Sequence, residues 1–148
     1  MKYFLVLAAL VTTALLVIAQ SGTPTSYYVD HDKVTAALKK NAGSILIRAA
    51  ELKTTVEANH RDNTDAVSVH DETDVYYVID GEATIVTGGI VVGGTPTKTG
   101  GSTGGEIRGG EERHLSKGDV IIIPSRSPHW FKQIPKSIDY LVVKVPKP

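Results

Sequence analysis

The chain has 148 residues, with 16 lysines and arginines against 16 aspartates and glutamates, and it has no cysteine. The length suits a single domain, and the zero net charge excludes a polybasic nucleic-acid-binding protein and a highly charged disordered tail. Without cysteine there can be no disulfide framework, no cysteine-bound zinc and no thiol nucleophile. Six tyrosines, 14 glycines and many valines and isoleucines favour β-structure.

The first 19 residues have the pattern of a signal peptide. Lys2 makes the amino end positive, and residues 4–18 form an apolar run that only two threonines interrupt. This run is shorter than the roughly 20 residues that a membrane-spanning helix needs. We therefore expect cleavage after Ala19, a secreted or periplasmic protein, and no membrane contact after cleavage. The alternative is an uncleaved membrane anchor.

One short helix is expected within the next segment, residues 20–43. Asp30 can cap a helix over His31–Lys40, because an aspartate at this position accepts a hydrogen bond from the first turn. Asn41 and Gly43 would end this helix.

Residues 44–148 are predicted to form one barrel of short strands. In residues 52–61 the pattern of apolar and polar residues repeats every two residues, as in a strand. Val56, Ala58 and His60 would face inward, and the charged residues between them would face water. Turn sequences such as Asp80-Gly81 separate the further strands. These are expected at Ala66–His70, Val75–Ile79, Ala83–Thr87, Ile90–Val92, Arg113–Leu115, Val120–Ile123, Trp130–Ile134 and Tyr140–Val145. Many short strands with one helix indicate a sandwich or a barrel.

Residues 88–110 differ from the rest in composition. They hold ten of the 14 glycines as five Gly-Gly pairs, so they are expected to form a flexible loop or a long flexible hairpin. One interpretation is a tolerated surface insertion. The other is a lid over the barrel mouth, in which Arg108 would bind a carboxylate of a ligand.

Two stretches resemble the two motifs of the cupin superfamily. Residues 70–83 match the first motif, with His70, the carboxylate of Asp74 and the turn glycine Gly81 at its positions. Residues 118–131 match the second motif, from Gly118 and Asp119 through Pro124 to the last histidine, His129. The sequence departs from the motifs in having Ser68 in place of a histidine, Asp74 in place of the usual glutamate and Arg126 at a frequent glycine position.

The resemblance implies an all-β fold, a double-stranded β-helix of the cupin or jelly-roll type, with the short helix and the glycine-rich segment as additions. It also implies a divalent metal ion held by His70, Asp74 and His129. Two imidazoles and one carboxylate suit Fe, Mn, Zn, Ni or Cu. His60 could replace the histidine that is missing at Ser68, although a hydrogen-bonded core histidine is the alternative reading of His60.

Further residues are candidates for the pocket around this metal. Ser68, Tyr76, Tyr77 and Trp130 are expected as walls, and Arg108, Arg126 or His60 would orient a substrate.

Three functions remain open at this stage. The first is a metal-dependent enzyme, of the dioxygenase, isomerase or lyase type, that acts on a small polar organic molecule. The second is a metal-free barrel that binds such a molecule without turnover. The third is a structural domain that associates with itself, and a homodimer is expected in that case. No nucleic-acid partner is expected.

Overall fold

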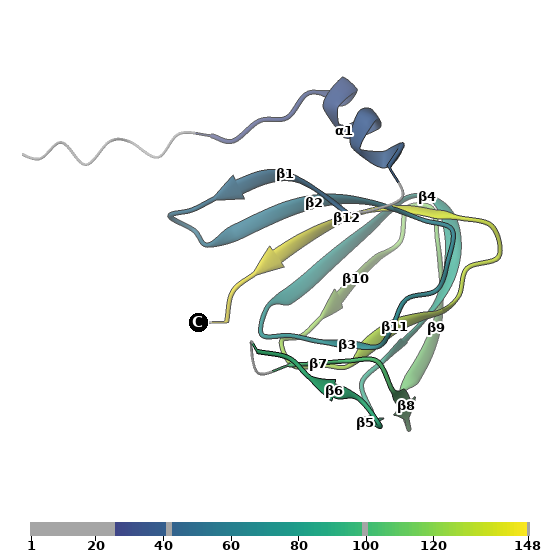
Figure 1. Ribbon diagram of the computed structural model, residues 1–148. Coiled ribbons are helices and arrows are strands. Elements are labelled where there is room, and N and C mark those ends of the chain that lie inside the picture. The colour runs from purple at the N-terminus through teal and green to yellow at the C-terminus, as the bar shows by residue number, and fades with distance from the viewer. Residues whose placement is uncertain (1–25, 41–42, 99–100, 148) are drawn as a thin grey trace, which may run out of the picture.

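The computed structural model describes residues 26–40, 43–98 and 101–147 (Figure 1). The predicted signal peptide, residues 1–19, lies outside the described residues, as does Asn41. Within the described part of the chain, no helix has the length and apolar character to cross a membrane. Helix α1 runs over His31–Leu38 and ends two residues before its predicted end. As predicted, Asp30 is its N-cap, and its carboxylate accepts a hydrogen bond of 2.9 Å from the backbone N–H of Lys33.

Two antiparallel layers share one long strand, β4, which spans Thr73–Thr87. The first layer has the order β1 (Ser44–Ala49), β2 (Thr54–Arg61), β12 (Ile138–Val145), β4 and β10 (Val120–Ile123). The second has the order β6 (Thr95–Pro96), β7 (Ser102–Thr103), β3 (Ser68–Val69), β11 (His129–Gln133), β4 and β9 (Glu111–Ser116). The two layers curve toward each other around a common interior (Figure 1). The predicted all-β double-stranded β-helix is therefore confirmed.

Strand β4 passes from one layer to the other at Gly81. Residues 73–81 pair with β12 and residues 82–87 pair with β9. The prediction that Asp80-Gly81 ends one strand and begins another is wrong. Gly81 instead bends a continuous strand, because it has a φ of +76° and a Cβ at this position would lie 2.1 Å from the carbonyl oxygen of Ser137.

The interior is filled by side chains from both layers. The buried core residues are Tyr76, Val78, Ala83, Ile85, Leu115, Ile123, Phe131, Ile138, Tyr140 and Val142. Three of the aromatic rings pack together, with 4.9 Å between the centroids of Tyr76 and Tyr140 and 5.3 Å between those of Phe131 and Tyr140. They form the inner wall next to the site described below.

The two faces of β2 are reversed relative to the prediction. Its residues Thr55, Glu57 and Asn59 pair with Lys144, Val142 and Tyr140 of β12, and paired residues share a face of the sheet. Because Val142 and Tyr140 are core residues, this set faces the interior. Ala58 lies on the opposite face of β2. It is buried on the outside of the barrel, where α1 packs on β1 and β2 (Figure 1).

The glycine-rich segment forms a long hairpin of short strands in its described part. Strand β5 (Ile90–Val92) pairs with β8 (Glu106–Arg108), and β6 pairs with β7 farther along the same hairpin. Strand β7 also pairs with β3. The close approach requires glycine at Gly101, where a Cβ would lie 1.8 Å from the carbonyl oxygen of Val69. Of the two predicted forms the hairpin is present, and its flexibility remains a prediction.

We predict that Gly81→Ala lowers the free energy of unfolding by at least about 2 kcal/mol, because the alanine adds a backbone clash to an unfavourable left-handed conformation. Gly88→Ala is the matched control, since Gly88 has a φ of +75° but, among the described residues other than its chain neighbours, no atom lies within 4 Å of the place that a Cβ would take. It should lose only about 1 kcal/mol. Urea unfolding of both variants measures the difference, and equal losses would contradict the role given to Gly81.

Candidate metal centre

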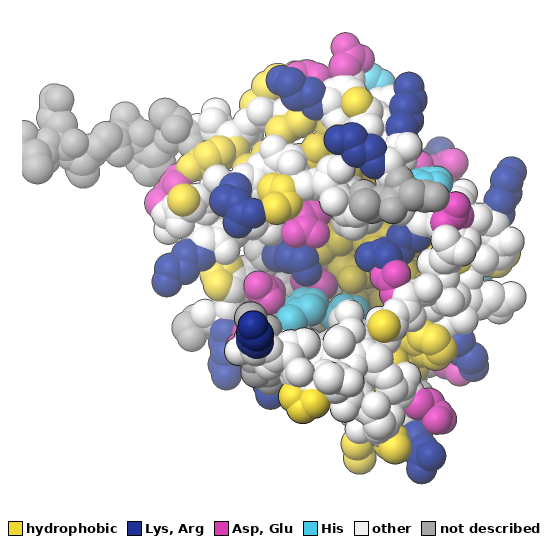
Figure 2. Space-filling view, viewed as in Figure 1, with side chains coloured by type: hydrophobic (Ala, Val, Ile, Leu, Met, Phe, Trp, Pro, Cys, Tyr) yellow, Lys and Arg dark blue, Asp and Glu magenta, His cyan; other side chains and the backbone are white. Residues whose placement is uncertain are grey.

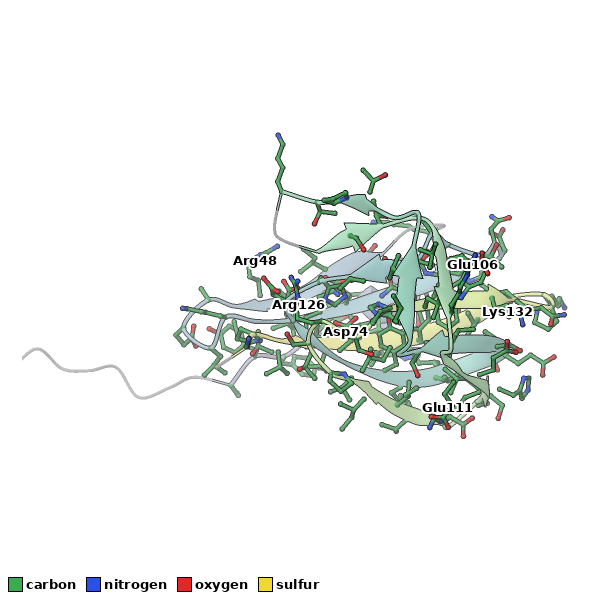
Figure 3. The ribbon with its side chains drawn as sticks, turned by 90° about the horizontal axis from the view of Figure 1, so that it is seen from below. Arg48, Asp74, Glu106, Glu111, Arg126 and Lys132 are labelled. Atoms are coloured by element: carbon green, nitrogen blue, oxygen red, sulfur yellow. The ribbon has the colours of Figure 1, made fainter. Side chains whose placement is uncertain are left out.

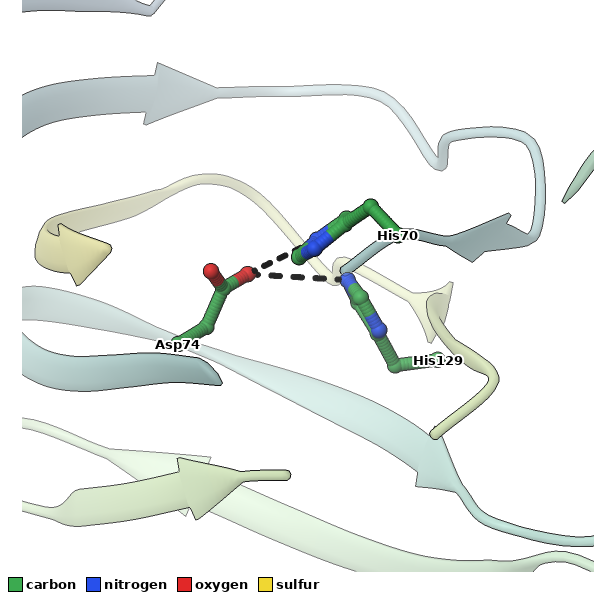
Figure 4. Close-up of side chains that lie close together, drawn as sticks. All are labelled: His70, Asp74 and His129. Atoms are coloured by element: carbon green, nitrogen blue, oxygen red, sulfur yellow. Dashed lines mark ion pairs between the residues drawn. The ribbon is translucent and has the colours of Figure 1, made fainter. Parts of the chain in front are cut away.

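Three side chains converge inside the barrel from three different strands or strand ends (Figure 4). His70 follows β3, Asp74 lies near the start of β4, and His129 is the first residue of β11. The Nε2 atoms of His70 and His129 lie 3.2 Å and 3.8 Å from Oδ2 of Asp74. One donor atom from each residue lies within 4.8 Å of the other two. The structure thus brings together the three residues that the sequence motifs indicate.

Asp74 is the most buried member of this group, with 1% of its side chain exposed. It lies among the strands, whereas Arg48 and Lys132 lie at the periphery (Figure 3). Asp74 is opposite Lys144 in the pairing of β4 with β12, and Nζ of Lys144 lies 3.1 Å from its Oδ1. The hydroxyl of Tyr76 also donates to Oδ2 over 3.4 Å. A buried carboxylate needs such partners, because an unpaired charge is costly away from water.

The loop before β11 holds His70 in place. The backbone N–H of Arg126 donates to the carbonyl oxygen of His70 over 2.8 Å, and the Arg126 guanidinium pairs with Asp71 over 3.1 Å. Arg126 has a φ of +68°, a left-handed conformation that glycine adopts most easily. This conformation explains why the motif often has a glycine at this position. Nδ1 of His70 lies 3.3 Å from Glu72, on the side away from Asp74.

The orientation of His129 is set by a backbone group. Nδ1 of its ring lies 3.0 Å from the carbonyl oxygen of Ser127, so Nδ1 carries the proton and donates it. Burial lowers the pKa of His129, which favours the neutral ring. In the neutral tautomer Nε2 has a lone pair, and this lone pair faces the carboxylate of Asp74. The Nε2 lone pair and the carboxylate are both electron donors, and a cation between them would bind to both.

The charges of His70 and Asp74 depend on each other. The hydrogen bond to Asp74 raises the pKa of His70, although burial opposes this shift. Burial alone would raise the pKa of Asp74, but the hydrogen bond from His70 and the charge of Lys144 outweigh it, and the pKa of Asp74 is lowered. Asp74 is therefore ionised at neutral pH, as a metal ligand must be.

These three residues open into a cavity of about 140 Å³. Figure 2 shows histidine side chains (cyan) beside acidic and basic side chains around a hollow with a hydrophobic floor. Three of the predicted wall residues, Ser68, Tyr76 and Trp130, line this cavity. Ser68 pairs with His129 between β3 and β11, so it lies next to the metal-ligand candidates.

Several other predicted site residues do not line this cavity. His60 lies on the outer face of β2, where Nδ1 is 2.5 Å from Asp139, and it lines a separate surface pocket. Its prediction as an additional metal ligand is wrong, because the inward face of β2 is the opposite one. Arg108 is two-thirds exposed on β8, and Tyr77 is half-exposed on the outside of β4. Arg126, which pairs with Asp71, does not line the cavity either.

Two basic residues outside the predicted site, Lys144 and Arg61, also line the cavity. Lys144 shares the inward face of β12 with Tyr140 and Val142, so the alternation of that strand contained the signal for it. Alternation along β2 predicts a solvent-facing Arg61, and this prediction is wrong because α1 covers the other face of β2.

Arg61 and Tyr140 form a polar contact on the cavity wall. Nε of Arg61 donates to the phenol oxygen of Tyr140 over 2.7 Å, and Nη1 of Arg61 pairs with Asp65. Burial raises the pKa of Tyr140 to about 12, although the charge of Arg61 opposes this shift. Tyr140 therefore stays protonated over the whole neutral range.

The geometry of the three ligand candidates fits a metal ion. Ligand bonds of about 2.0–2.2 Å place neighbouring donor atoms roughly 3–3.5 Å apart. The distances of 3.2 Å and 3.8 Å from Asp74 to the two rings are close to this requirement, and all three donor atoms lie within 4.8 Å of one another. Asp74 would keep Oδ1 on Lys144 and offer Oδ2 to the ion.

Comparisons with known proteins identify structural relatives only. No protein-family model matches the sequence, and no curated protein sequence matches it either. Among solved structures, the chain is similar to the DMSP lyase DddQ from Ruegeria pomeroyi DSS-3, with a TM-score of 0.51 and 17% identity over 70% of this chain and 46% of that one. It is also similar to a cupin 2 conserved barrel domain protein from Rhodopseudomonas palustris, with a TM-score of 0.50 and 13% identity over 70% and 59% of the two chains.

A third similar structure is a protein from Neisseria meningitidis, with a TM-score of 0.56 and 10% identity over 80% of this chain and 99% of that one. The chain thus spans about half the length of the lyase and well under two thirds of the barrel domain protein. At these identities the likeness shows the fold alone.

We predict that the buried phenol of Tyr140 makes the fold sensitive to alkali. Since the pKa of Tyr140 rises from 10.0 to about 12 on folding, its contribution to stability is complete below pH 10 and is lost as the pH rises through 12. A shift of this size corresponds to roughly 2–3 kcal/mol. Unfolding measured across this range should be less dependent on pH in Tyr140→Phe. Tyr77→Phe removes a half-exposed phenol as the control, and an equal effect of the two variants would contradict the assignment.

Proposed function

Because the chain has the cupin barrel fold, we propose that it binds a divalent metal ion through His70, Asp74 and His129 and holds a small polar organic molecule beside that ion. The observation that carries the proposal is the lone pair of His129 Nε2, which the Ser127 carbonyl turns toward Asp74 Oδ2 at 3.8 Å. Two imidazoles and one carboxylate suit Fe, Mn, Zn, Ni or Cu.

The bound ion would supply Lewis-acid chemistry to an oxygen of the organic ligand. His70 would lose its Nε2 proton to solvent, keep a proton on Nδ1 beside Glu72, and offer Nε2 as a ligand. The rings of Tyr76, Phe131 and Tyr140 would exclude water from one side of the ligand, and Ser68 and Trp130 would bound the other side. An enzyme of the lyase, dioxygenase or isomerase type is consistent with this arrangement, and the DMSP lyase is one such neighbour.

A metal-free binding barrel is the second candidate, and Lys144 favours it. Its ammonium group already lies 3.1 Å from Asp74 and supplies a positive charge where a metal would supply one. The same cavity would then hold a small molecule through hydrogen bonds to Tyr76, His70 and Lys144, without turnover.

The proposal includes an extracytoplasmic location. The apolar run of residues 4–18 is consistent with a secreted or periplasmic protein. Since the chain has no cysteine, its structure would rely on packing alone. Amino-terminal sequencing of the exported protein would place the cleavage site.

Self-association is proposed for the outer face of the first layer. Val120, Ile122 and Tyr77 are 63%, 62% and 48% exposed, and Val120 pairs directly with Tyr77. Among the described strands β10 pairs only with β4, so its other edge has unpaired backbone groups. An apolar edge of this kind can pair with the same edge of a second copy.

We predict that the protein, reconstituted separately with Fe, Mn, Zn, Ni and Cu, retains one ion per chain of at least one of these metals. His70→Ala and His129→Ala should each weaken the affinity by more than about 100-fold, because each removes one of three ligands. Elemental analysis after gel filtration and a competitive chelator titration measure both effects.

His114→Ala is the matched control for this experiment. His114 is an exposed histidine on β9 that pairs with Glu82, and its loss should leave metal binding unchanged. Retention of the ion in both His70→Ala and His129→Ala, or no retention of any of the five metals, would overturn the proposed metal centre.

We predict that Ile122→Lys weakens self-association by at least about tenfold, since it places a charge in the apolar edge. Ile90→Lys, at an isoleucine of the hairpin that is 72% exposed, is the control. Sedimentation over a range of concentrations distinguishes monomer from dimer, and a monomeric parent protein would refute this part of the proposal.

A further inference from the structure

We propose that the organic ligand of the cavity is a small carboxylate anion and that Arg61 binds its carboxylate. This inference rests on the proposed metal centre and names the class of molecule that the same cavity accepts. It follows from the charges around the cavity, from the way Arg61 is held and from the volume that remains for a ligand.

With both histidines neutral, the charged side chains of the cavity balance only while no metal is bound. Arg61 and Lys144 contribute two positive charges, and Asp65 and Asp74 contribute two negative charges. A divalent ion on neutral histidines adds two positive charges that no residue of the cavity lining offsets. A ligand that neutralises this excess is an anion, and a neutral or cationic molecule would leave the excess charge in a partly buried space.

The two carboxylates differ in how far they offset the nearby cations. Asp74 is 1% exposed and is shared by His70, Lys144 and the proposed ion, whereas Asp65 is 40% exposed. Water screens an exposed charge more strongly than a buried one. The positive charge of Arg61 is therefore only partly offset by Asp65.

Arg61 is held in a fixed orientation beside the cavity. Its Nε donates to Tyr140 over 2.7 Å and its Nη1 pairs with Asp65, so two of its nitrogens are anchored to the protein. A guanidinium group has five N–H donors, and it can present two of them in parallel to a carboxylate. A side chain anchored in this way loses little conformational entropy when it binds a ligand.

A chain of contacts through two tyrosines links Arg61 to the metal-ligand candidates. The phenol of Tyr140 contacts Arg61, its ring lies 4.9 Å from that of Tyr76, and the hydroxyl of Tyr76 lies 3.4 Å from Asp74. A ligand that spans these rings can place its carboxylate at Arg61 and another oxygen toward the proposed ion.

The cavity has room for a small ligand. Its volume of about 140 Å³ is close to the roughly 150 Å³ that accommodates a ring of six carbon atoms. Acetate, with four non-hydrogen atoms, and glycolate, with five, are therefore suitable probes. Acetamide and glycolamide have the same shapes without the charge.

The experiment is a calorimetric titration of the full mature protein, loaded with the metal it retains, with acetate, glycolate and the two amides. We expect the carboxylates to bind at least about tenfold more tightly than their amides. Arg61→Gln should weaken glycolate binding by 10- to 100-fold, as expected for the loss of a hydrogen bond between charged groups. Arg61→Lys should recover part of this loss, because it restores the charge without the paired N–H groups.

Arg48→Gln is the matched control, since Arg48 is an exposed arginine of the edge strand β1 that does not line the cavity. Its glycolate affinity should equal that of the parent protein. Metal content and thermal unfolding are measured on every variant, and Arg61→Lys serves as the test if Arg61→Gln is too unstable to purify.

The two proposals fail in different ways. If neither the parent protein nor any variant retains a metal, the metal centre is refuted. Carboxylate binding that still depends on Arg61 would then support the carboxylate inference by itself. A lack of such binding would refute this inference as well. If the protein retains its metal but binds amides as tightly as carboxylates, or binds glycolate equally well in Arg61→Gln, the metal centre stands and the carboxylate inference is overturned.

Discussion

The site depends on one buried carboxylate, that of Asp74. It is 1% exposed, and it is ionised because His70, Lys144 and the hydroxyl of Tyr76 surround it. An ionised group at this depth must be matched by positive charge or hydrogen-bond donors. The barrel meets this requirement with groups from different strands, and of the two histidines it is His70 that supplies a donor to the carboxylate. The proposed metal ion would take over part of that role.

The fold brings these groups together through β4 and its neighbours. Strand β4 belongs to both layers and bends at Gly81, so Asp74 lies opposite Lys144 in one layer while Thr87 lies opposite His129 in the other. Strand β11 also pairs with β3, which leads directly into His70. The turn before β11 fixes the ring of His129 through Ser127 and the backbone of His70 through Arg126. The site is thus positioned mostly by backbone pairing, which is stiffer than side-chain contact alone.

The two sequence motifs identified the three residues that converge. Alternation along β2 gave the wrong inward face, because α1 covers the opposite face of that strand. His70, Asp74 and His129 were found because their spacing along the chain is tied to the strand pairing of this fold. The sequence favours His60 over Arg61 as a site residue, because alternation identifies the two faces of a strand and does not tell which face lies inside the barrel. Here α1 covers the face of β2 that carries Ala58, so an apolar face is buried outside the barrel and Arg61 reaches the cavity.

The sequence alone determined the all-β class, the capped helix at Asp30 and the three residues that gather around one point, since each depends on local periodicity or on a motif of fixed spacing. Only the tertiary structure decided that Lys144 pairs with Asp74, that Arg61 lines the cavity and that Arg108 and His60 stay away from it. These outcomes depend on which strands lie side by side and on what covers each sheet face. Contacts between residues some 70 positions apart, such as Asp74 and Lys144, leave no periodic trace in a single chain.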